Sequence, residues 1–251
     1  MRVAVLGIDI GGTGIKGAPV DVRRGAVTAE RFRIKTPRPS TPDAVADVVG
    51  QIVAHFSYNG LVGVTFPGVV RNGVVETAAN VDKSWIGTDL PALLKTKLDV
   101  DAVAVNDADA AAIAETAHGA AKNVKGVVIL LTFGTGVGSG LVMDERLVPN
   151  TELGHLELDG KDAERHVAES VREKNNWSWK QWAKRANNYL ASVDALFSPD
   201  LFVIGGGIDK AAQDWLPLLQ TRAPVEVARL GNLAGIIGAA KNAQRLAARV
   251  R

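Results

Sequence analysis

Two glycine-rich segments of the chain could each wrap around phosphate oxygens. The first spans residues 9–17, Asp-Ile-Gly-Gly-Thr-Gly-Ile-Lys-Gly, and the second spans residues 131–140. Each follows a short apolar run typical of a buried strand, at residues 3–8 and 127–131. A strand that breaks into glycines presents backbone N–H groups without side chains in the way, and such turns bind anions. One loop of this kind is a common structural joint, but two predict a phosphate chain held from two sides, as in phosphoryl transfer.

Two charged residues accompany the first loop. Asp9 ends the apolar run directly before the glycines, and Lys16 follows them. A carboxylate beside phosphate oxygens is unfavourable unless a cation lies between them, and Mg²⁺ is the usual cation. Asp9 could instead cap the glycine turn. Lys16 could reach a phosphate as a point charge, or it could be a solvated strand residue.

A polar pair, Asn106 and Asp107, ends the apolar run of residues 102–105. Ligand-facing groups are expected where a buried strand of an α/β fold emerges. A carboxylate at that point can accept the proton of an attacking hydroxyl, as in kinase catalytic loops. The alternative is that Asp107 caps the helix that starts at Ala108.

Further candidates follow the second loop. Glu152 and His155 could share one face around a tight glycine, and both side-chain types suit sugar hydroxyls; they could also be surface residues. A third strand ends in residues 205–207, which are all glycine. These glycines could pack a nucleotide base or line a phosphate tunnel, or they could form a strand–helix turn without a ligand.

A tryptophan-rich segment, residues 177–185, carries three basic side chains: Lys180, Lys184 and Arg185. The two lysines lie one helical turn apart and therefore share a face. Such a face is usually only solvated. Here it could also line a route for a long polyanion.

The composition limits the class of protein. The chain has 251 residues with 47% hydrophobic content, and its 29 basic and 27 acidic residues give a net charge of +2. These values are ordinary for a globular protein and argue against a general electrostatic binder of nucleic acid. There is no cysteine, which excludes disulfides, a thiolate zinc site and a thiol nucleophile. We find neither a signal-peptide pattern nor an apolar run near the roughly 20 residues of a membrane span, so the expected location is cytoplasmic.

The elements that must position these residues follow a repeated order of strand, hairpin, helix, strand and helix. Helices are predicted at residues 42–56, 90–98, 108–117, 161–172, 178–197 and 232–249. Strands are predicted at residues 3–9, 17–22, 28–33, 61–66, 102–106, 127–131 and 201–204, with hairpins at 69–76 and 140–147. An Asn-Gly pair at residues 72–73 is the turn signal of the first hairpin. This order predicts two α/β domains, each a mixed sheet flanked by helices.

Taken together, five motifs resemble the ROK family of sugar kinases. They are Asp-Ile-Gly-Gly-Thr at 9–13, Phe-Pro-Gly-Val-Val at 66–70, Asn-Asp at 106–107, Gly-Thr-Gly-Val-Gly-Ser-Gly at 134–140 and Glu-Leu-Gly-His at 152–155. The resemblance implies an actin-like ATPase or hexokinase-type fold, with two α/β domains around a cleft, and usually a homodimer. We expect a small domain at 1–109, completed by the C-terminal helix at 234–251, and a large domain at 110–233.

Within that family the chain looks closest to the polyphosphate glucokinase branch, through residues 80–85, 178–185 and 198–207. Most members carry a cysteine-rich zinc motif soon after Glu-x-Gly-His. Here residues 156–169 contain no cysteine. The expected zinc site is therefore missing, and whatever it orders must be held in another way.

The resemblance also implies roles for individual residues. Asp107 is the implied general base, which takes the proton from the 6-hydroxyl of the sugar. Glucose contacts are implied for Gly68, Asn80, Asn106, Asp107, Glu152, His155 and Glu164. Phosphate or donor contacts are implied for Asp9, Gly11, Gly12, Thr13, Lys16, Thr132, Gly134, Thr135, Gly136, Gly205, Gly206 and Gly207. Asp9 is expected to orient Mg²⁺ through water, and a polyphosphate groove is expected along Lys180, Lys184 and Arg185.

The predicted function is phosphoryl transfer from inorganic polyphosphate, and also from ATP, to glucose, with Mg²⁺ as cofactor. No nucleic acid or membrane partner is expected. The alternatives are an ATP-only ROK glucokinase and a glucomannokinase. A sugar-sensing repressor of the same family is disfavoured, because those carry an N-terminal helix-turn-helix whereas this chain starts in the phosphate-loop strand. The joint presence of Asp9, Asn106, Asp107 and both loops disfavours a non-catalytic binding module.

Overall fold

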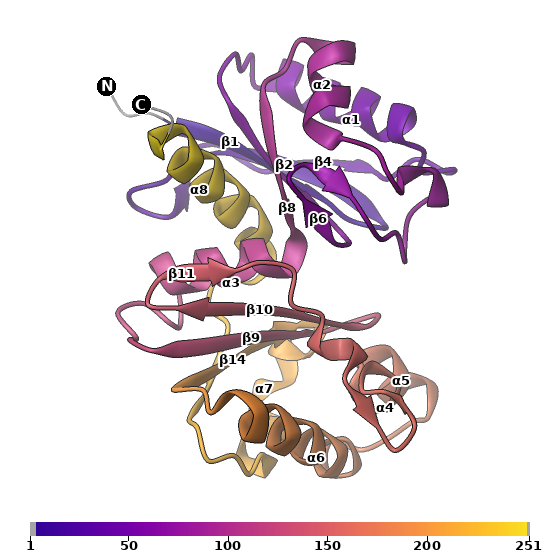
Figure 1. Ribbon diagram of the computed structural model, residues 1–251, viewed down its shortest axis with the longest axis vertical. Coiled ribbons are helices and arrows are strands. Elements are labelled where there is room, and N and C mark those ends of the chain that lie inside the picture. Colours follow the sequence, from indigo (N-terminus) through magenta and orange to yellow (C-terminus); the bar gives the residue numbers. More distant parts are fainter. Residues whose placement is uncertain (1–3, 250–251) are drawn as a thin grey trace. The chain divides into compact units, whose positions relative to one another are not determined.

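The computed structural model of the chain describes residues 4–249 (Figure 1). The chain divides into two compact units. The first comprises the chain up to Ala114 together with the chain from Asn232 onward, and the second runs from Glu115 to Gly231. Each unit has its own sheet and its own buried apolar core.

The sheet of the first unit has six strands in the order β3-β2-β1-β5-β8, and β4 also pairs with β2. The bounds are Ala4–Ile10 (β1), Gly14–Asp21 (β2), Ala26–Val27 (β3), Phe32–Lys35 (β4), Val62–Phe66 (β5) and Ala102–Asn106 (β8). Strands β1 and β2 form an antiparallel hairpin, whereas β1, β5 and β8 run parallel. The carboxyl ends of these three strands therefore share one edge, which is where open α/β sheets bind ligands.

Helices lie on both faces of this sheet (Figure 1). The bounds are Pro42–His55 (α1), Leu90–Leu98 (α2) and Ala234–Arg249 (α8), whereas Asp107–His118 (α3) follows β8 and passes into the second unit after Ala114. Successive side chains of a strand point to opposite faces, so Leu6 and Ile8 of β1 join the core under α1 while Gly7 faces α8. A side chain at Gly7 would run into the carbonyl oxygen of Ile236. Helix α8 can therefore approach the strand only because this position is glycine.

A short hairpin follows β5. Strands β6 (Val70–Arg71) and β7 (Val74–Val75) pair antiparallel. Asn72 and Gly73 both have positive φ, 51° and 88°, as a two-residue hairpin turn requires. The predicted turn is confirmed, and a 3₁₀-helix at Lys83–Trp85 continues the segment.

The second unit contains a five-stranded sheet in the order β11-β10-β9-β14-β15. The bounds are Val127–Phe133 (β9), Val137–Met143 (β10), Arg146–Val148 (β11), Leu201–Gly206 (β14) and Val225–Val227 (β15). Strand β10 is antiparallel to β9, and β14 is parallel to β9. The turn between β9 and β10 and the end of β14 thus lie at the same edge.

The helices of the second unit surround an aromatic core. The bounds are Glu164–Val167 (α4), Glu169–Lys174 (α5), Trp179–Phe197 (α6) and Ala212–Trp215 (α7), with 3₁₀-helices at Leu153–His155, Gly207–Ala211 and Leu216–Leu218. Helix α6 starts in a capping box of Ser178 and Gln181. Its buried Trp182 packs edge-on against Phe133, the last residue of β9. This contact ties α6 to the strand that carries the second glycine loop. None of the helices within residues 4–249 is long and apolar enough to cross a membrane.

Two predictions of secondary structure were wrong. The helix expected at 161–172 begins instead with a strand, Lys161–Asp162 (β13), paired with Glu157–Leu158 (β12). Asp159 and Gly160 have φ of 50° and 74° and form the turn between them, so a local hairpin overrides the helical pattern. Of the strand expected at 28–33, only residues 32–33 are in a strand, β4, and β3 ends before that range begins.

Candidate active site

The first glycine loop is held by side chains that bind its carbonyl groups. The carbonyls of residues 11–13 accept hydrogen bonds from Thr36 Oγ1 (2.5 Å), Arg38 (3.2 Å) and Arg33 (3.3 Å) in turn. Both arginines are exposed. The loop therefore has a fixed backbone with two positive charges beside it, which favours an anionic ligand.

Asp9, near the end of β1, lies beside a positive charge and beside the N-terminus of a helix. Its Oδ1 accepts the hydroxyl of Thr65 at 2.7 Å, and its Oδ2 forms an ion pair with Lys16 Nζ at 2.9 Å. The first turn of α8 comes so close that a side chain at Gly235 would touch the carboxyl group. The N-terminus of a helix favours a negative charge. Lys16 is thus the direct partner of Asp9 and not a solvated strand residue.

Asn106 and Asp107 divide the two roles that the sequence left open. Asn106 is buried, and its Oδ1 accepts the backbone N–H groups of Ala108 (2.8 Å) and Asp109 (3.1 Å). Its amide also donates to the carbonyl of Gly68 at 3.0 Å. Asn106 is therefore a cap of α3. Asp107 also accepts the N–H of Ala108, at 2.8 Å, but its side chain is exposed, so the carboxyl group is within reach of a ligand.

Two further predicted sugar contacts lie in the first unit. Gly68 is in such close contact with the carbonyl of Thr77 that no side chain fits there. Asn80 is exposed, and its carbonyl oxygen lies 3.4 Å from where a side chain on Gly12 would begin. The segment that carries Asn80 therefore touches the first glycine loop.

The second glycine loop is held from α4 and α5. Within residues 134–136, the first N–H donates to the last carbonyl at 3.0 Å. Ser170 donates its N–H to Gly134 (3.1 Å) and its hydroxyl to Thr135 (2.7 Å). The carboxylate of Glu164 accepts the N–H of Val137 at 3.3 Å. These bonds fix the loop backbone, and they place a carboxylate beside it.

The third glycine run lies next to the second loop. The parallel register pairs Gly205 with Thr132 of β9, so residues 205–207 emerge beside the loop that follows β9. The carboxyl group of Glu169 lies against Gly207 and occupies the space of a side chain there. Burial raises the pKa of Glu169, and the neighbouring Glu173 raises it further.

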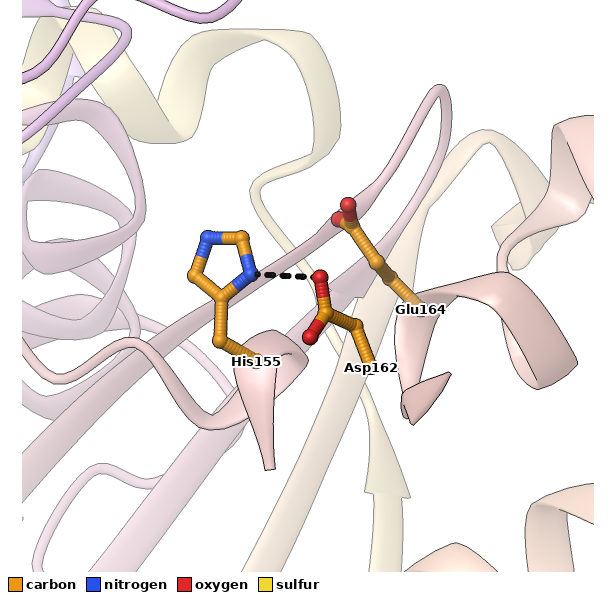
Figure 2. Close-up of side chains that lie close together, drawn as sticks. All are labelled: His155, Asp162 and Glu164. Carbon is orange, nitrogen blue, oxygen red and sulfur yellow. Dashed lines mark hydrogen bonds and ion pairs between the residues drawn. The ribbon is translucent and has the colours of Figure 1, made fainter. Parts of the chain in front are cut away.

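A cluster of Glu152, His155, Asp162 and Glu164 stands beside these loops, and the last three are drawn in Figure 2. His155 Nδ1 lies 3.3 Å from Asp162 Oδ2. One atom each of His155, Asp162 and Glu164 lies within 4.8 Å of the others, a spacing that could also hold a cation. Burial raises the pKa of the half-buried Glu152 above its ordinary value, while His155 lowers it and Glu164 raises it.

The basic side chains on α6 differ in their freedom. The guanidinium of Arg185 stacks 3.7 Å above the ring of Trp177 and donates to the carbonyl of Gln181 at 2.8 Å. Lys180 and Lys184 are exposed. The two lysine side chains are therefore accessible to a ligand in solution, whereas the Arg185 side chain is held by its contacts with Trp177 and Gln181.

The predicted residues form one group in each unit. At the loop edge of the first sheet lie Asp9, Gly11, Gly12, Thr13, Lys16, Gly68, Asn80, Asn106 and Asp107. At the loop edge of the second sheet lie Thr132, Gly134, Thr135, Gly136, Gly205, Gly206, Gly207, Glu152, His155 and Glu164. Lys180, Lys184 and Arg185 lie on α6.

Several residues at these sites escaped the sequence reasoning. They are Arg33, Arg38, Asp162, Glu169 and Ser170. The Asp-Gly pair at 159–160 is a turn signal that could have placed Asp162 beside His155. Arg33 reaches the first loop through the register of β4, and Arg38 reaches it from the segment after β4, and the sequence carries no local signal for either contact.

Comparison with known proteins decides the family. The model of the ROK family matches residues 5–166. The chain belongs to the ROK family. The predicted fold is confirmed, because ROK structures of the hexokinase type superpose on nearly the whole chain.

Two ROK relatives are close in sequence. A polyphosphate glucokinase from Mycobacterium tuberculosis is 52% identical over 235 residues, which cover 93% of this chain and 89% of the relative. The crystal structure of an inorganic polyphosphate/ATP-glucomannokinase from an Arthrobacter species is 48% identical, with a TM-score of 0.92 over 97% of this chain and 99% of that one. A ROK glucokinase from Streptomyces griseus, solved with glucose and AMPPNP, is 23% identical with a TM-score of 0.83 over 97% of this chain and 100% of that one, and it supports the fold alone.

Proposed function

We propose that this protein is a polyphosphate glucokinase. It transfers a phosphoryl group from inorganic polyphosphate, and also from ATP, to the 6-hydroxyl of glucose. The observation that carries the proposal is the 52% identity with a polyphosphate glucokinase over 93% of the chain. The two fixed glycine loops and the exposed carboxyl group of Asp107 agree with it.

Asp107 is the proposed general base. Its carboxyl group is exposed at the end of β8, while Asn106 caps α3 beside it and keeps the backbone in place. A base in this position takes the proton from the sugar hydroxyl as that oxygen attacks phosphorus. General-base catalysis contributes about 10²–10⁴-fold to such reactions. The rest of the acceleration comes from positioning and charge stabilisation, because the transition state of phosphoryl transfer is loose.

We propose that glucose hydroxyls bind to a set of polar groups at the ends of strands and in the loops that follow them. The proposed set is Gly68, Asn80, Asn106, Asp107, Glu152, His155 and Glu164. The carboxylates and the imidazole accept or donate hydrogen bonds in fixed directions, which is what a sugar ring with several hydroxyls requires. Glu152 accepts hydrogen bonds without donating any only when it is ionised, and burial raises the pKa of that ionisation.

The donor is proposed to bind along the glycine loops. The proposed set is Gly11, Gly12, Thr13, Lys16, Thr132, Gly134, Thr135, Gly136, Gly205, Gly206 and Gly207, with Lys180, Lys184 and Arg185 contacting the more distant part of polyphosphate. Asp9 suits magnesium, because its carboxylate oxygens are the ligands that this ion prefers. Thr65 and Lys16 already engage both oxygens, which favours contact through water. When bound, magnesium would neutralise charge on the transferred phosphoryl group.

The test of this proposal compares two donors. Purified protein is incubated with glucose and MgCl₂, once with polyphosphate and once with ATP, and glucose 6-phosphate is measured. We expect product with both donors and none without magnesium. Product from ATP alone would replace the proposal with an ATP-only glucokinase, and no product from either donor would favour a binding protein. A homodimer and a cytoplasmic location remain predictions.

A second candidate function is a glucomannokinase. It is favoured by the 48% identity with the Arthrobacter enzyme, which is named a glucomannokinase. Replacing glucose with mannose in the same assay decides between the two. A ratio of kcat/KM for glucose over mannose below about ten would indicate a glucomannokinase, because one hydrogen bond is worth about a factor of ten.

A further inference from the structure

A small hairpin joins two of the proposed sugar-binding residues. Strands β12 and β13 pair Glu157 with Asp162 and Leu158 with Lys161. The N–H of Ala163 donates to the carbonyl of Leu156 at 2.8 Å and closes the base of the hairpin. Because His155 precedes the hairpin and Glu164 follows it, the hairpin sets how these two side chains meet.

The hairpin brings Asp162 to one particular nitrogen of His155. The carboxylate Oδ2 lies 3.3 Å from Nδ1 (Figure 2). An ionised carboxylate can only accept hydrogen bonds, so this contact requires a proton on Nδ1. In the neutral ring, the other nitrogen, Nε2, is then an acceptor. Glu164 is directed to the loop instead, where it accepts the N–H of Val137.

This pair contributes little to stability. The His155 side chain is 59% exposed and that of Asp162 is 40% exposed, and ion pairs at such exposure are worth little. The orientation of the ring is a more direct consequence. An imidazole that is free to rotate offers either nitrogen, whereas one bonded at Nδ1 offers a single acceptor in a defined direction.

A second histidine provides an internal comparison. His166 Nε2 lies 3.1 Å from the carbonyl of Leu158 on the same hairpin. A carbonyl also only accepts, so His166 requires its proton on Nε2. The hairpin thus selects opposite tautomers for two of the four histidines of the chain.

We propose that Asp162 is a positioning residue, which holds His155 in the Nδ1–H tautomer so that Nε2 accepts a hydrogen bond from a sugar hydroxyl. The identity of the ligand rests on the proposed function, whereas the tautomer is a property of the free protein.

The first test is nuclear magnetic resonance of ¹⁵N-histidine-labelled protein without ligand. We compare wild type with Asp162→Ala, Asp162→Asn and the matched control Glu157→Gln, which removes one exposed charge directly opposite Asp162. The wild type and the control should show His155 with its proton on Nδ1. Asp162→Ala should move the proton toward Nε2, and Asp162→Asn should do so in part, because its amide can either accept from or donate to the ring.

The signals of His166 report whether the hairpin is intact. If His166 is unchanged and His155 keeps its proton on Nδ1 in Asp162→Ala, the proposal is wrong. If His166 also changes in that variant, the hairpin has been disturbed, and the wild-type spectrum decides: a proton on Nδ1 of His155 supports the proposal and a proton on Nε2 refutes it. A stoichiometric shift of both His155 nitrogens on adding Zn²⁺ to chelator-treated wild type would make the cluster a metal site and would also refute it.

The second test is kinetic. Asp162→Ala should raise the KM for glucose about tenfold, the worth of one hydrogen bond, with a smaller change in kcat and in the KM for the donor. Asp162→Asn should fall between Asp162→Ala and wild type, and Glu157→Gln should stay within about twofold of wild type. An unchanged KM for glucose in a variant whose tautomer has changed would overturn the role in sugar binding. A wild type inactive with glucose would remove the proposed function and leave the tautomer result standing.

Discussion

At the scale of single residues, the end of β8 places a buried polar side chain next to an exposed one. Asn106 is buried and makes three hydrogen bonds that hold the start of α3. Its neighbour Asp107 is exposed. A group that reacts has to be accessible, and the group that positions it has to be fixed, so the order of these two residues in the chain suits a catalytic pair.

Asp107→Ala should retain glucose binding and lose nearly all turnover. The expected loss in kcat is about 10²–10⁴-fold, the range for removal of a general base. The measurement is kcat from the glucose 6-phosphate assay, with glucose affinity from calorimetry. Asp101→Ala, which removes an exposed carboxyl group at the opposite end of β8, is the matched control. A variant that keeps more than about a tenth of the wild-type rate would be too active for this role.

Lys16→Met should weaken both donors equally. Lys16 lies 2.9 Å from Asp9, so its removal leaves a less positive phosphate site and should raise both donor KM values about tenfold. The Mg²⁺ concentration for half-maximal rate should fall, because Asp9 loses its competing cation. Lys35→Met, at an exposed lysine on β4, is the control. A higher Mg²⁺ requirement in Lys16→Met would argue against the competition.

At the scale of elements, α6 has one face packed against the core and another face exposed to solvent. Trp182 is buried against Phe133, and the Nε1–H of Trp182 donates to the carbonyl of Val167 at 2.7 Å. Lys180 and Lys184 are exposed on the same helix. The helix can therefore hold charges at a constant distance from the second glycine loop, which suits a polymeric donor more than a short one.

Lys180→Ala combined with Lys184→Ala should raise the KM for polyphosphate and leave the KM for ATP nearly unchanged. Two exposed charges are worth about tenfold together, and added salt should reduce the difference. Steady-state kinetics with both donors provide the measurement, with Lys122→Ala plus Lys125→Ala as a control pair of exposed lysines in the same unit. Equal effects on both donors, or no effect on either, would contradict the proposed polyphosphate groove along α6.

The elements also show what the sequence could predict. Strong local signals were sufficient for the capping box of α6 and for the Asn-Gly hairpin at 72–73. The helical periodicity at 161–172 hid a hairpin, because an Asp-Gly turn needs only two residues while a helix is judged over several turns.

The predicted site residues lie at the expected sheet edges because they follow strands, and the end of a strand is a local property. The contacts between them depend on register and on reversals of the chain. Arg33 reaches the first loop only because β4 pairs with β2 in the observed register. Asp162 reaches His155 only because the chain folds back at Gly160. Neither contact has a pattern within one segment.

At the scale of the whole molecule, stability should depend on pH through Glu152. Burial raises the pKa of this group in the folded protein above the ordinary value of 4.5. Between these two values the folded state binds more protons than the unfolded state, so the free energy of unfolding should fall as pH rises through that range. Glu152→Gln should show a shallower fall.

Denaturant unfolding of wild type and Glu152→Gln between about pH 4 and pH 7 measures this contribution as the difference between two curves. Glu169 acts in the same direction, so the fall should persist in part in the single variant. Glu157→Gln is the control for loss of an exposed charge. Parallel curves for wild type and Glu152→Gln would contradict the raised pKa.

The position of α8 has a consequence for synthesis of the protein. Gly7 and Gly63 give this helix room against β1 and β5, and a side chain at either position would strike its backbone. The ribosome makes those strands first and α8 only after the whole second unit, residues 115–231. Until α8 has been made, one face of the first sheet therefore stays uncovered, although the second unit already has all of its residues. The first unit should become resistant to proteases only after α8 has been made and has left the ribosome.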